Sequence, residues 1–239
     1  MKKVDKIKIF IGLLYFIAVC LFLYFLFSKF TIKEITSYEF IKNNRDYFFD
    51  IRQSNIFLLS IFFILFVILW VIAGGFGTPV AFFAGFIFGK WLGLLFLTIG
   101  MSIGATSLYI LANFFLKELI KEKFLNKFER LESKFKKSEF FYLLIYRFVG
   151  GIPFMISNVI PCIFNVKIYN FFWSTLIGII PSSFILTSIG SGLEKIIDQN
   201  LEAPTFISII TTPDIYIPLF FFGFLILSTF FLRKFFYKN

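Results

Sequence analysis

The sequence predicts an all-α integral membrane protein built on an inverted repeat of a re-entrant hairpin plus a transmembrane helix, with flanking N- and C-terminal transmembrane helices. Composition is the first indication: 59% of the residues are hydrophobic and only 16% are charged, against about a quarter charged in a typical globular domain. Phe alone supplies 41 of the 239 residues. No soluble core of this size could bury so much apolar surface, and long uncharged runs give that surface the length of membrane spans.

The uncharged runs define the elements. The first, 9–28, is 20 residues long, about the length that crosses the hydrocarbon core. We interpret it as a retained anchor helix, because it is too long for the apolar region of a signal peptide and no small-residue cleavage site follows it. The later runs, each close to or above a spanning length, are 53–89, 91–116, 148–166, 168–193 and 215–232.

Lysine and arginine predict the topology, since cytoplasmic loops are enriched in them. The N-terminal tail 1–8 carries four, the segment 117–139 eight and the C-terminal tail three, whereas 194–214 carries only Lys195. We therefore expect both termini and 117–139 to be cytoplasmic and 194–214 to be external. The segment 29–52 has five basic and four acidic residues, so its charge indicates little about the side of the membrane on which it lies.

The sides of the membrane assigned to these segments then require two hairpins, each of which enters and leaves the membrane on the same side. Because 91–116 must end at the cytoplasmic 117–139, 53–90 has to begin and end outside, and 140–167 likewise has to begin and end inside. Each contains helix-breaking residues where a turn is needed, and non-helical backbone at membrane depth is tolerated only inside protein or beside a wet cavity. The expected hairpin-turn and structural residues are Gly74, Gly75, Gly77, Pro79, Gly150, Gly151, Pro153 and Pro181. Paired broken segments in an inverted repeat point to a transporter's central site; the alternative is two kinked helices that cross completely.

Two further patterns concern packing. Residues 117–139 place apolar side chains on one helical face and charges on the other, which is typical of an interfacial helix; a connector helix packed on the bundle is the alternative. Gly85, Gly89 and Gly93, then Gly100 and Gly104, repeat the four-residue spacing that lets membrane helices approach closely. We interpret these glycines as packing residues that bring the first hairpin onto its own span.

Arg147 is the most informative single residue, because it lies in an apolar run with no acid nearby in sequence. A buried arginine costs several kcal/mol and usually has a partner, and guanidinium suits bidentate contact with phosphate. Amides exposed by a broken helix would add donors for an anion. Bracing of the hairpin's own carbonyls is the competing interpretation.

Several functions are disfavoured by what the sequence lacks. It has no His, its two cysteines, Cys20 and Cys162, form no metal-ligand spacing, and no catalytic or nucleotide-binding motif is present. We therefore predict no enzyme activity, no catalytic residue, no metal and no cofactor. Nucleic acid is an unsuitable partner, because the basic residues are confined to short segments between apolar runs. The runs 53–116 and 140–193 contain no Asp or Glu, although proton-coupled carriers usually need a membrane carboxylate.

The order of motifs resembles the VTT-domain family, also known as DedA-like or "SNARE-associated Golgi protein". The similar residues run from Arg147 to Pro161, from Phe171 to Pro181 and from Ser188 to Gly192, with Gly85 to Gly93 and Gly100 to Gly104 upstream. This resemblance, which covers 74–192, implies two facing re-entrant hairpins and movement of phospholipids or polyprenyl phosphates between leaflets. Two departures are Gly150, where the family often has Pro, and the lack of acids within the first hairpin; they favour downhill scrambling over proton-coupled export.

Together these inferences give a working hypothesis. The chain divides into an anchor helix and outer linker (1–52), a membrane domain (53–193, with re-entrant hairpins at about 53–90 and 140–167) and an outer loop with a C-terminal helix (194–239). We expect a multi-pass protein of the cytoplasmic membrane that acts as a lipid scramblase or flippase. Arg147 would hold the lipid phosphate, and Asn158 and Thr175 would offer neutral hydrogen bonds. The alternatives are a small-solute transporter and a non-transporting assembly factor; a homo-oligomer is left open.

Overall fold

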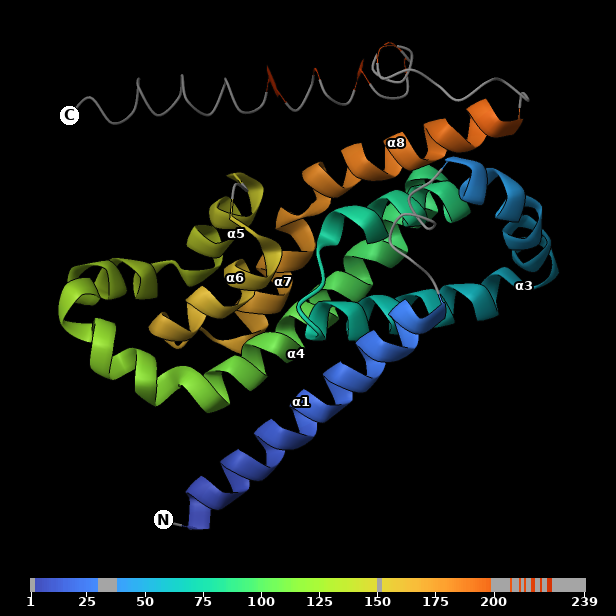
Figure 1. Cartoon of the computed structure of the whole chain (residues 1–239). Helices are drawn as coiled ribbons and strands as arrows, with labels where there is room; N and C mark the ends of the chain where they lie inside the picture. Colours follow the sequence, from blue (N-terminus) through green and yellow to red (C-terminus); the bar gives the residue numbers. More distant parts are fainter. Residues whose placement is uncertain are drawn as a thin grey trace.

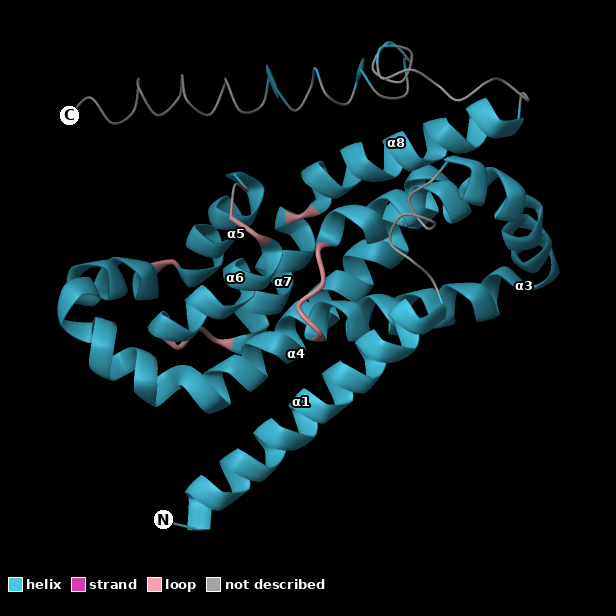
Figure 2. Cartoon of the chain, viewed as in Figure 1, coloured by secondary structure: helices cyan, strands magenta, loops and turns pink. Residues whose placement is uncertain are grey.

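The computed structural model describes residues 3–29, 38–149 and 152–198, together with single positions between 207 and 224. Within these residues the chain is helical throughout, with short loops and no strand (Figure 2), which confirms the predicted all-α class. Gly150 and Gly151 of the second expected turn, and most of the expected last span 215–232, lie outside the described residues.

Eight elements make up the described chain (Figure 1). They are α1 (Lys3–Lys29), α3 (Tyr38–Ile72), α4 (Gly77–Lys137), α5 (Glu139–Val149), α6 (Phe154–Val159), the 3-10 helix η1 (Ile160–Phe164), α7 (Ile168–Gly178) and α8 (Ile180–Asp198). Two stretches are long and apolar enough to cross a membrane, Asp46–Ile72 and Gly77–Phe115, and the bent pair α7–α8 makes a third if counted as one span. The apolar stretch of α1, Phe10–Phe25, is shorter.

The first helix break falls where the glycines predict it. α3 ends at Ile72, and Gly74 adopts a φ of +84°, a left-handed conformation that glycine adopts without steric cost. The indole Nε1 of Trp70 donates a hydrogen bond to the Phe76 carbonyl at 2.8 Å. Gly75 leaves the space for that indole, since a Cβ there would lie 2.3 Å from the ring. Gly77 and Pro79 then belong to the first turn of α4.

A second reversal interrupts α4 at Gly89, whose φ is +77°. Ala84 and Gly93, nine residues apart, would be separated by about 13 Å along a straight helix. Instead, a Cβ on Gly93 would lie 2.4 Å from the Ala84 carbonyl oxygen. The chain therefore folds back at Gly89, so that the short arm 77–88 lies against the helix that follows it.

The remaining small residues are close-contact points, as the spacing predicts. A Cβ on Gly100 or Gly104 would come within 3.0 Å of side-chain atoms of α3 (Val67 and Val71). Gly85 lies against its own span, where a Cβ on Gly93 would be 3.0 Å from its backbone nitrogen, and also against Thr187 of α8. Gly89 also departs from the packing interpretation: nothing lies within 4 Å of its hypothetical Cβ, and it serves as the turn itself.

The second half begins with two short helices. α5 has 11 residues, and α6 with η1 spans Phe154–Phe164, so each is about half the length needed to cross the hydrocarbon. Pro153 is the N-cap residue of α6, where the absence of its N–H costs nothing. η1 ends at Asn165 in a left-handed conformation, and α7 follows from Ile168. Both short helices pack near α4 or α7.

The segment 117–139, predicted as a separate surface helix, is continuous with the preceding span as far as Lys137. No Gly or Pro interrupts that stretch, so the backbone has no reason to break where the apolar run ends. The side chains of 116–135 lie outside the described set. α5 starts at Glu139, after a bend at Ser138.

Candidate functional site: a buried arginine between two short helices

Arg147 lies in the last turn of α5, and only 6% of its surface is exposed. Leu143, one turn earlier, is also buried, whereas Phe141 and Ile145 on the other face are exposed. α5 is therefore amphipathic in an unusual way: its exposed face is apolar, as suits lipid, and its inner face ends in a cation. The helix periodicity itself directs Arg147 into the protein.

Two neutral side chains of α6 hold the guanidinium. Nη1 donates to Ser157 Oγ at 2.5 Å, and Nη2 donates to Asn158 Oδ1 at 2.6 Å. Ser157 Oγ in turn donates to the Phe154 carbonyl at 2.7 Å. These bonds connect α5 to α6 across the turn between them, so Arg147 braces the hairpin in the conformation that the structure describes.

Aromatic rings complete the enclosure. The guanidinium carbon lies 5.2 Å from the ring centroids of both Phe154 and Phe171, and 6.0 Å from that of Tyr146, within the range of cation–π attraction. Gly178 makes room for the arginine stem, because a Cβ there would lie 2.5 Å from Arg147 Cβ. The aromatic rings and the arginine stem, which fits where Gly178 has no side chain, therefore enclose the guanidinium in place of water.

The Phe171 ring is held in place by a contact with α4. Its ring stacks on Tyr109 of α4 with centroids 4.5 Å apart and planes 16° from parallel. The Tyr109 hydroxyl donates to the Val166 carbonyl at 2.7 Å, just before α7 begins. Tyr109 therefore holds both the start of α7 and the ring that faces Arg147, which links the long helix α4 to the site.

Four polar atoms on the residues of this centre have no hydrogen-bond partner although they are buried: Tyr146 Oη, Arg147 Nε, Asn158 Nδ2 and Thr175 Oγ1. Asn158 and Thr175 are fully buried. Thr175 lies on the face of α7 between Phe171 and Gly178, both of which contact Arg147. An unsatisfied buried polar atom costs about 1–3 kcal/mol. Two N–H donors and two hydroxyls with spare capacity match a ligand that only accepts, such as a phosphate oxygen.

The charges around Arg147 also favour an anionic ligand. Among the described residues, the hydrogen-bond partners of Arg147 are the neutral side chains of Ser157 and Asn158, and 140–193 contains no carboxylate. A cation buried without a counter-ion retains its full attraction for an anion, because low-dielectric surroundings strengthen Coulomb interactions. The centre can therefore receive one negative group without first breaking an ion pair.

The structure brings all three residues of the expected binding set, Arg147, Asn158 and Thr175, into one region. Asn158 was expected to contact ligand, and in the described conformation its amide oxygen binds Arg147 itself. The expected turn regions also approach each other: a Cβ on Gly74 would lie 2.9 Å from the sulfur of Met155, two residues after Pro153. Pro181 is the second residue of α8, next to the 42° bend between α7 and α8.

Ser157, Phe171 and Gly178 contribute to the site, but the sequence interpretation did not single them out. Ser157 could have been found, because it is a polar neighbour of Asn158 in an apolar run. Phe171 opens a segment that resembles the family, but nothing distinguished it as a site residue among 41 phenylalanines, and its role depends on a tertiary contact. In the described ranges, no three His, Cys, Asp or Glu residues gather in a group that could hold a metal ion.

Comparison with known proteins adds the evolutionary context. The family model of the VTT domain matches residues 72–192. "Transmembrane protein 41 homolog" of Caenorhabditis elegans is 23% identical over 137 residues, covering 54% of this chain and 56% of that protein. "Uncharacterized protein YqeD" of Bacillus subtilis (strain 168) is 29% identical over 109 residues, covering 45% of this chain and 52% of that protein. The chain thus spans about half the length of the curated relatives it matches, and no solved structure matches it.

Proposed function

Because the chain belongs to the VTT-domain family, we propose that it moves lipids with phosphate head groups between the two leaflets of a membrane, down their own gradient. One observation carries the proposal: a buried arginine, without a carboxylate partner among the described residues, lies in a centre with three other buried polar atoms that lack hydrogen bonds. A phosphate supplies the acceptors that these atoms need, while the lipid's acyl tails remain in the bilayer.

The short helices support a path for the head group. α5 and α6 with η1 are each too short to span the hydrocarbon, which favours a re-entrant second hairpin whose turn lies within the membrane. In the first hairpin only the arm 77–88 is short, whereas the stretch Asp46–Ile72 is long enough to cross. The contact between Gly74 and Met155 is consistent with turns that meet. Since Arg147 is buried in the described conformation, α5 and α6 have to separate for phosphate to enter, and the phosphate then replaces Ser157 and Asn158 as acceptor.

The hairpins imply an orientation that we propose for the whole chain: both termini and 117–139 on the cytoplasmic side of the cell membrane, and 194–214 outside. Cysteine labelling in intact cells tests it, in a background where Cys20 and Cys162 are replaced. We expect Asn200→Cys to react with an impermeant maleimide from outside and Lys127→Cys to react only after the membrane is opened. Labelling of Lys127→Cys from outside would contradict the inverted repeat.

Downhill movement follows from the chemistry of the path. Arginine keeps its proton at physiological pH, and 53–116 and 140–193 offer no carboxylate that could change charge during transport. The lysines nearest the hairpins, Lys90 and Lys167, are expected at the membrane surfaces. A coupled carrier needs a titrating group inside the membrane, so we propose equilibration without coupling.

Reconstitution separates this proposal from its competitors. Purified protein in liposomes with a fluorescent phospholipid should make the inner-leaflet lipid accessible to an external quencher, in proportion to protein per vesicle. Small-solute uptake by the same vesicles, without lipid movement, would identify a solute transporter instead. If neither lipid nor solute moves, while an inactive control protein gives the same trace, the chain is an assembly factor.

A further inference from the structure

A charged side chain lies directly before each expected hairpin and bonds to the far end of that same hairpin. Arg52 precedes the first hairpin, 53–90, and Glu139 precedes the second, 140–167. The partner of Arg52 lies 35 residues further along the chain, and the backbone partner of Glu139 lies 28 residues further. We call these two contacts the base clasps. Their charges are opposite, so they share a position in the hairpin and not a residue type.

The first base clasp joins Arg52 to the carboxyl end of the arm 77–88. Arg52 Nη1 donates to the Ile87 carbonyl at 3.1 Å. The guanidinium carbon also lies 5.4 Å from the centroid of the Phe49 ring, and that ring meets Phe86 edge-on with centroids 6.3 Å apart. A cation at the carboxyl end of a helix has the favourable sign for the helix dipole. A charge and an aromatic pair therefore hold the start of the hairpin to its end.

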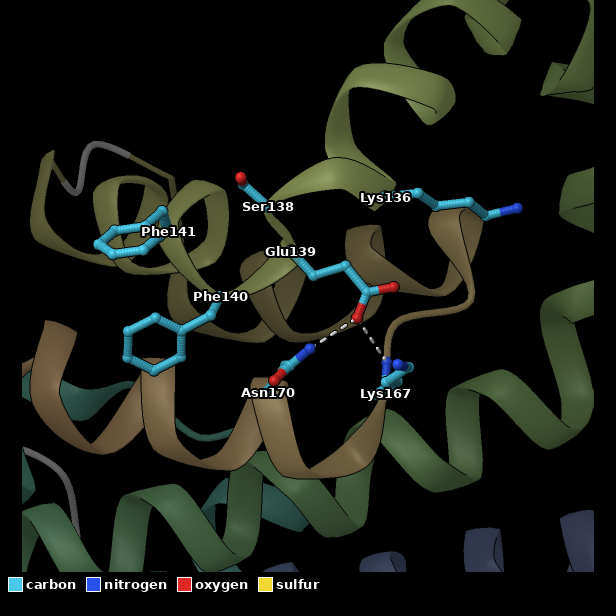
Figure 3. A pocket seen from close by; sticks show the side chains of 7 residues that line it. All are labelled: Lys136, Ser138, Glu139, Phe140, Phe141, Lys167 and Asn170. Carbon is cyan, nitrogen blue, oxygen red and sulfur yellow. Dashed lines mark hydrogen bonds between the residues drawn. The ribbon is translucent and has the colours of Figure 1, made fainter.

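The second base clasp joins Glu139 to the start of α7. Glu139 Oε2 accepts the Lys167 backbone N–H at 3.3 Å and the Asn170 side-chain amide at 2.8 Å (Figure 3). A carboxylate at the amino end of a helix again has the favourable sign. The neighbouring Val166 carbonyl accepts the hydroxyl of Tyr109 on α4. The start of α7 is therefore fixed to the long helix, and Glu139 ties the base of α5 to this fixed point.

α5 is thus bonded at both ends, but only one end has to open for phosphate. At its tip, Arg147 bonds Ser157 and Asn158, the neutral acceptors that a phosphate would replace. At its base, nothing in that step would replace the partners of Glu139. The bend at Ser138 separates α5 from α4, so α5 can tilt about its base while its tip moves away from α6.

From these contacts we propose that Arg52 and Glu139 are positioning residues for lipid movement: the base clasps stay closed and are the pivots about which the hairpin tips separate. The inference rests on the proposed function, since separation of the tips serves phosphate entry at Arg147. It assigns the movement to the turns inside the membrane and excludes a gate at the hairpin bases.

Flipping by variants that lose one base clasp tests the positioning role. Glu139→Ala should slow flipping by about tenfold, the equivalent of one charged hydrogen bond, whereas Glu139→Gln should retain most of it because the amide oxygen accepts the same two bonds. Arg52→Met should likewise lose flipping and Arg52→Lys should retain more of it. Lys167→Gln is the matched control, because it removes an exposed charge at the same place and leaves the backbone N–H. Wild-type flipping in either Glu139→Ala or Arg52→Met would overturn the proposal.

A covalent link distinguishes a pivot from a gate and from a general loss of structure. In a background where Cys20 and Cys162 are replaced, Glu139→Cys combined with Asn170→Cys should flip slowly. Both positions line an open pocket (Figure 3), so a short, water-soluble thiol cross-linker can reach them. We expect cross-linking to restore flipping, because it closes the base again. Flipping that stays slow or falls further after cross-linking would overturn the proposal, as would wild-type flipping before it.

The geometry of the second base clasp is measured separately from transport. Spin labels on Ser138→Cys and Tyr169→Cys, two exposed positions on either side of the clasp, should give one narrow distance distribution in the otherwise wild-type protein and with Lys167→Gln. With Glu139→Ala the distribution should broaden towards longer distances. These distances in a protein that moves no lipid would contradict the proposed function and leave the closed base in place. Identical distributions with and without Glu139→Ala would contradict the base clasp even where lipids move.

Discussion

Arg147→Lys is expected to slow lipid flipping by about 10- to 100-fold, which is the rate equivalent of losing one charged hydrogen bond of about 1.5–3 kcal/mol. Lysine keeps the positive charge, but its compact ammonium cannot replace the planar group that bonds both Ser157 and Asn158 and lies beside Phe171. The measurement is the flipping rate per reconstituted protein, together with the melting temperature of the same preparation in detergent.

Ser157→Ala is the matched control, because it removes one bracing partner of the guanidinium and leaves the charge in place. If Arg147 binds phosphate, Ser157→Ala should lower the melting temperature but retain most of the flipping, whereas Arg147→Lys and Arg147→Gln should lose it. If the arginine acts only as a brace, flipping and melting temperature should fall together in all three variants. Unchanged flipping in Arg147→Gln would remove this residue from the transport path.

Gly190→Ala should have the largest effect on stability. Gly190 of α8 lies so close to the arm 77–88 that a Cβ would approach the Phe82 carbonyl oxygen to 2.0 Å. Backbone cannot yield as a flexible side chain does, and overpacking costs about 1–3 kcal/mol. We expect the melting temperature to fall by several degrees.

Gly12→Ala provides the comparison, because its Cβ would meet the Phe115 ring at an ordinary 3.5 Å. This second glycine-to-alanine change in a membrane helix should leave the melting temperature almost unchanged. Equal melting temperatures for Gly190→Ala and the wild type would show that α8 does not cross the first half of the domain at this point. The crossing joins the two halves, so its loss would also undermine the proposed repeat.

Sequence reasoning succeeds here where a local rule decides the structure. The helix breaks fall near Gly74 and Pro153 because glycine and proline interrupt helices independently of their neighbours. Arg147 was singled out because a cation in an apolar run is exceptional, and the structure buries it; its contact with phosphate stays a proposal. Asn158 and Thr175 were chosen as polar residues of the same runs, and the structure places both near Arg147.

Contacts between segments that are far apart in the sequence could not be predicted from such local rules. Gly89 has the spacing of a packing residue, and only the contact between Ala84 and Gly93 reveals it as a chain reversal. The bond between Arg147 and Asn158 depends on how the turn between α5 and α6 brings positions 11 apart together. Continuity of α4 to Lys137 was missed because a change from apolar to charged residues resembles a helix boundary, although neither type of residue interrupts a helix.

The central claim is that lipids equilibrate through this protein without an energy source. The most direct test is flipping of a fluorescent phospholipid in liposomes with and without an imposed pH difference, with a proton ionophore as control. We predict the same rate and the same final distribution in every arm, because 53–116 and 140–193 contain no Asp, Glu or His that could carry a proton through the membrane. A rate or distribution that follows the pH difference and disappears with ionophore would contradict the account, and Asp50, just before the first hairpin, would then be the first residue to replace.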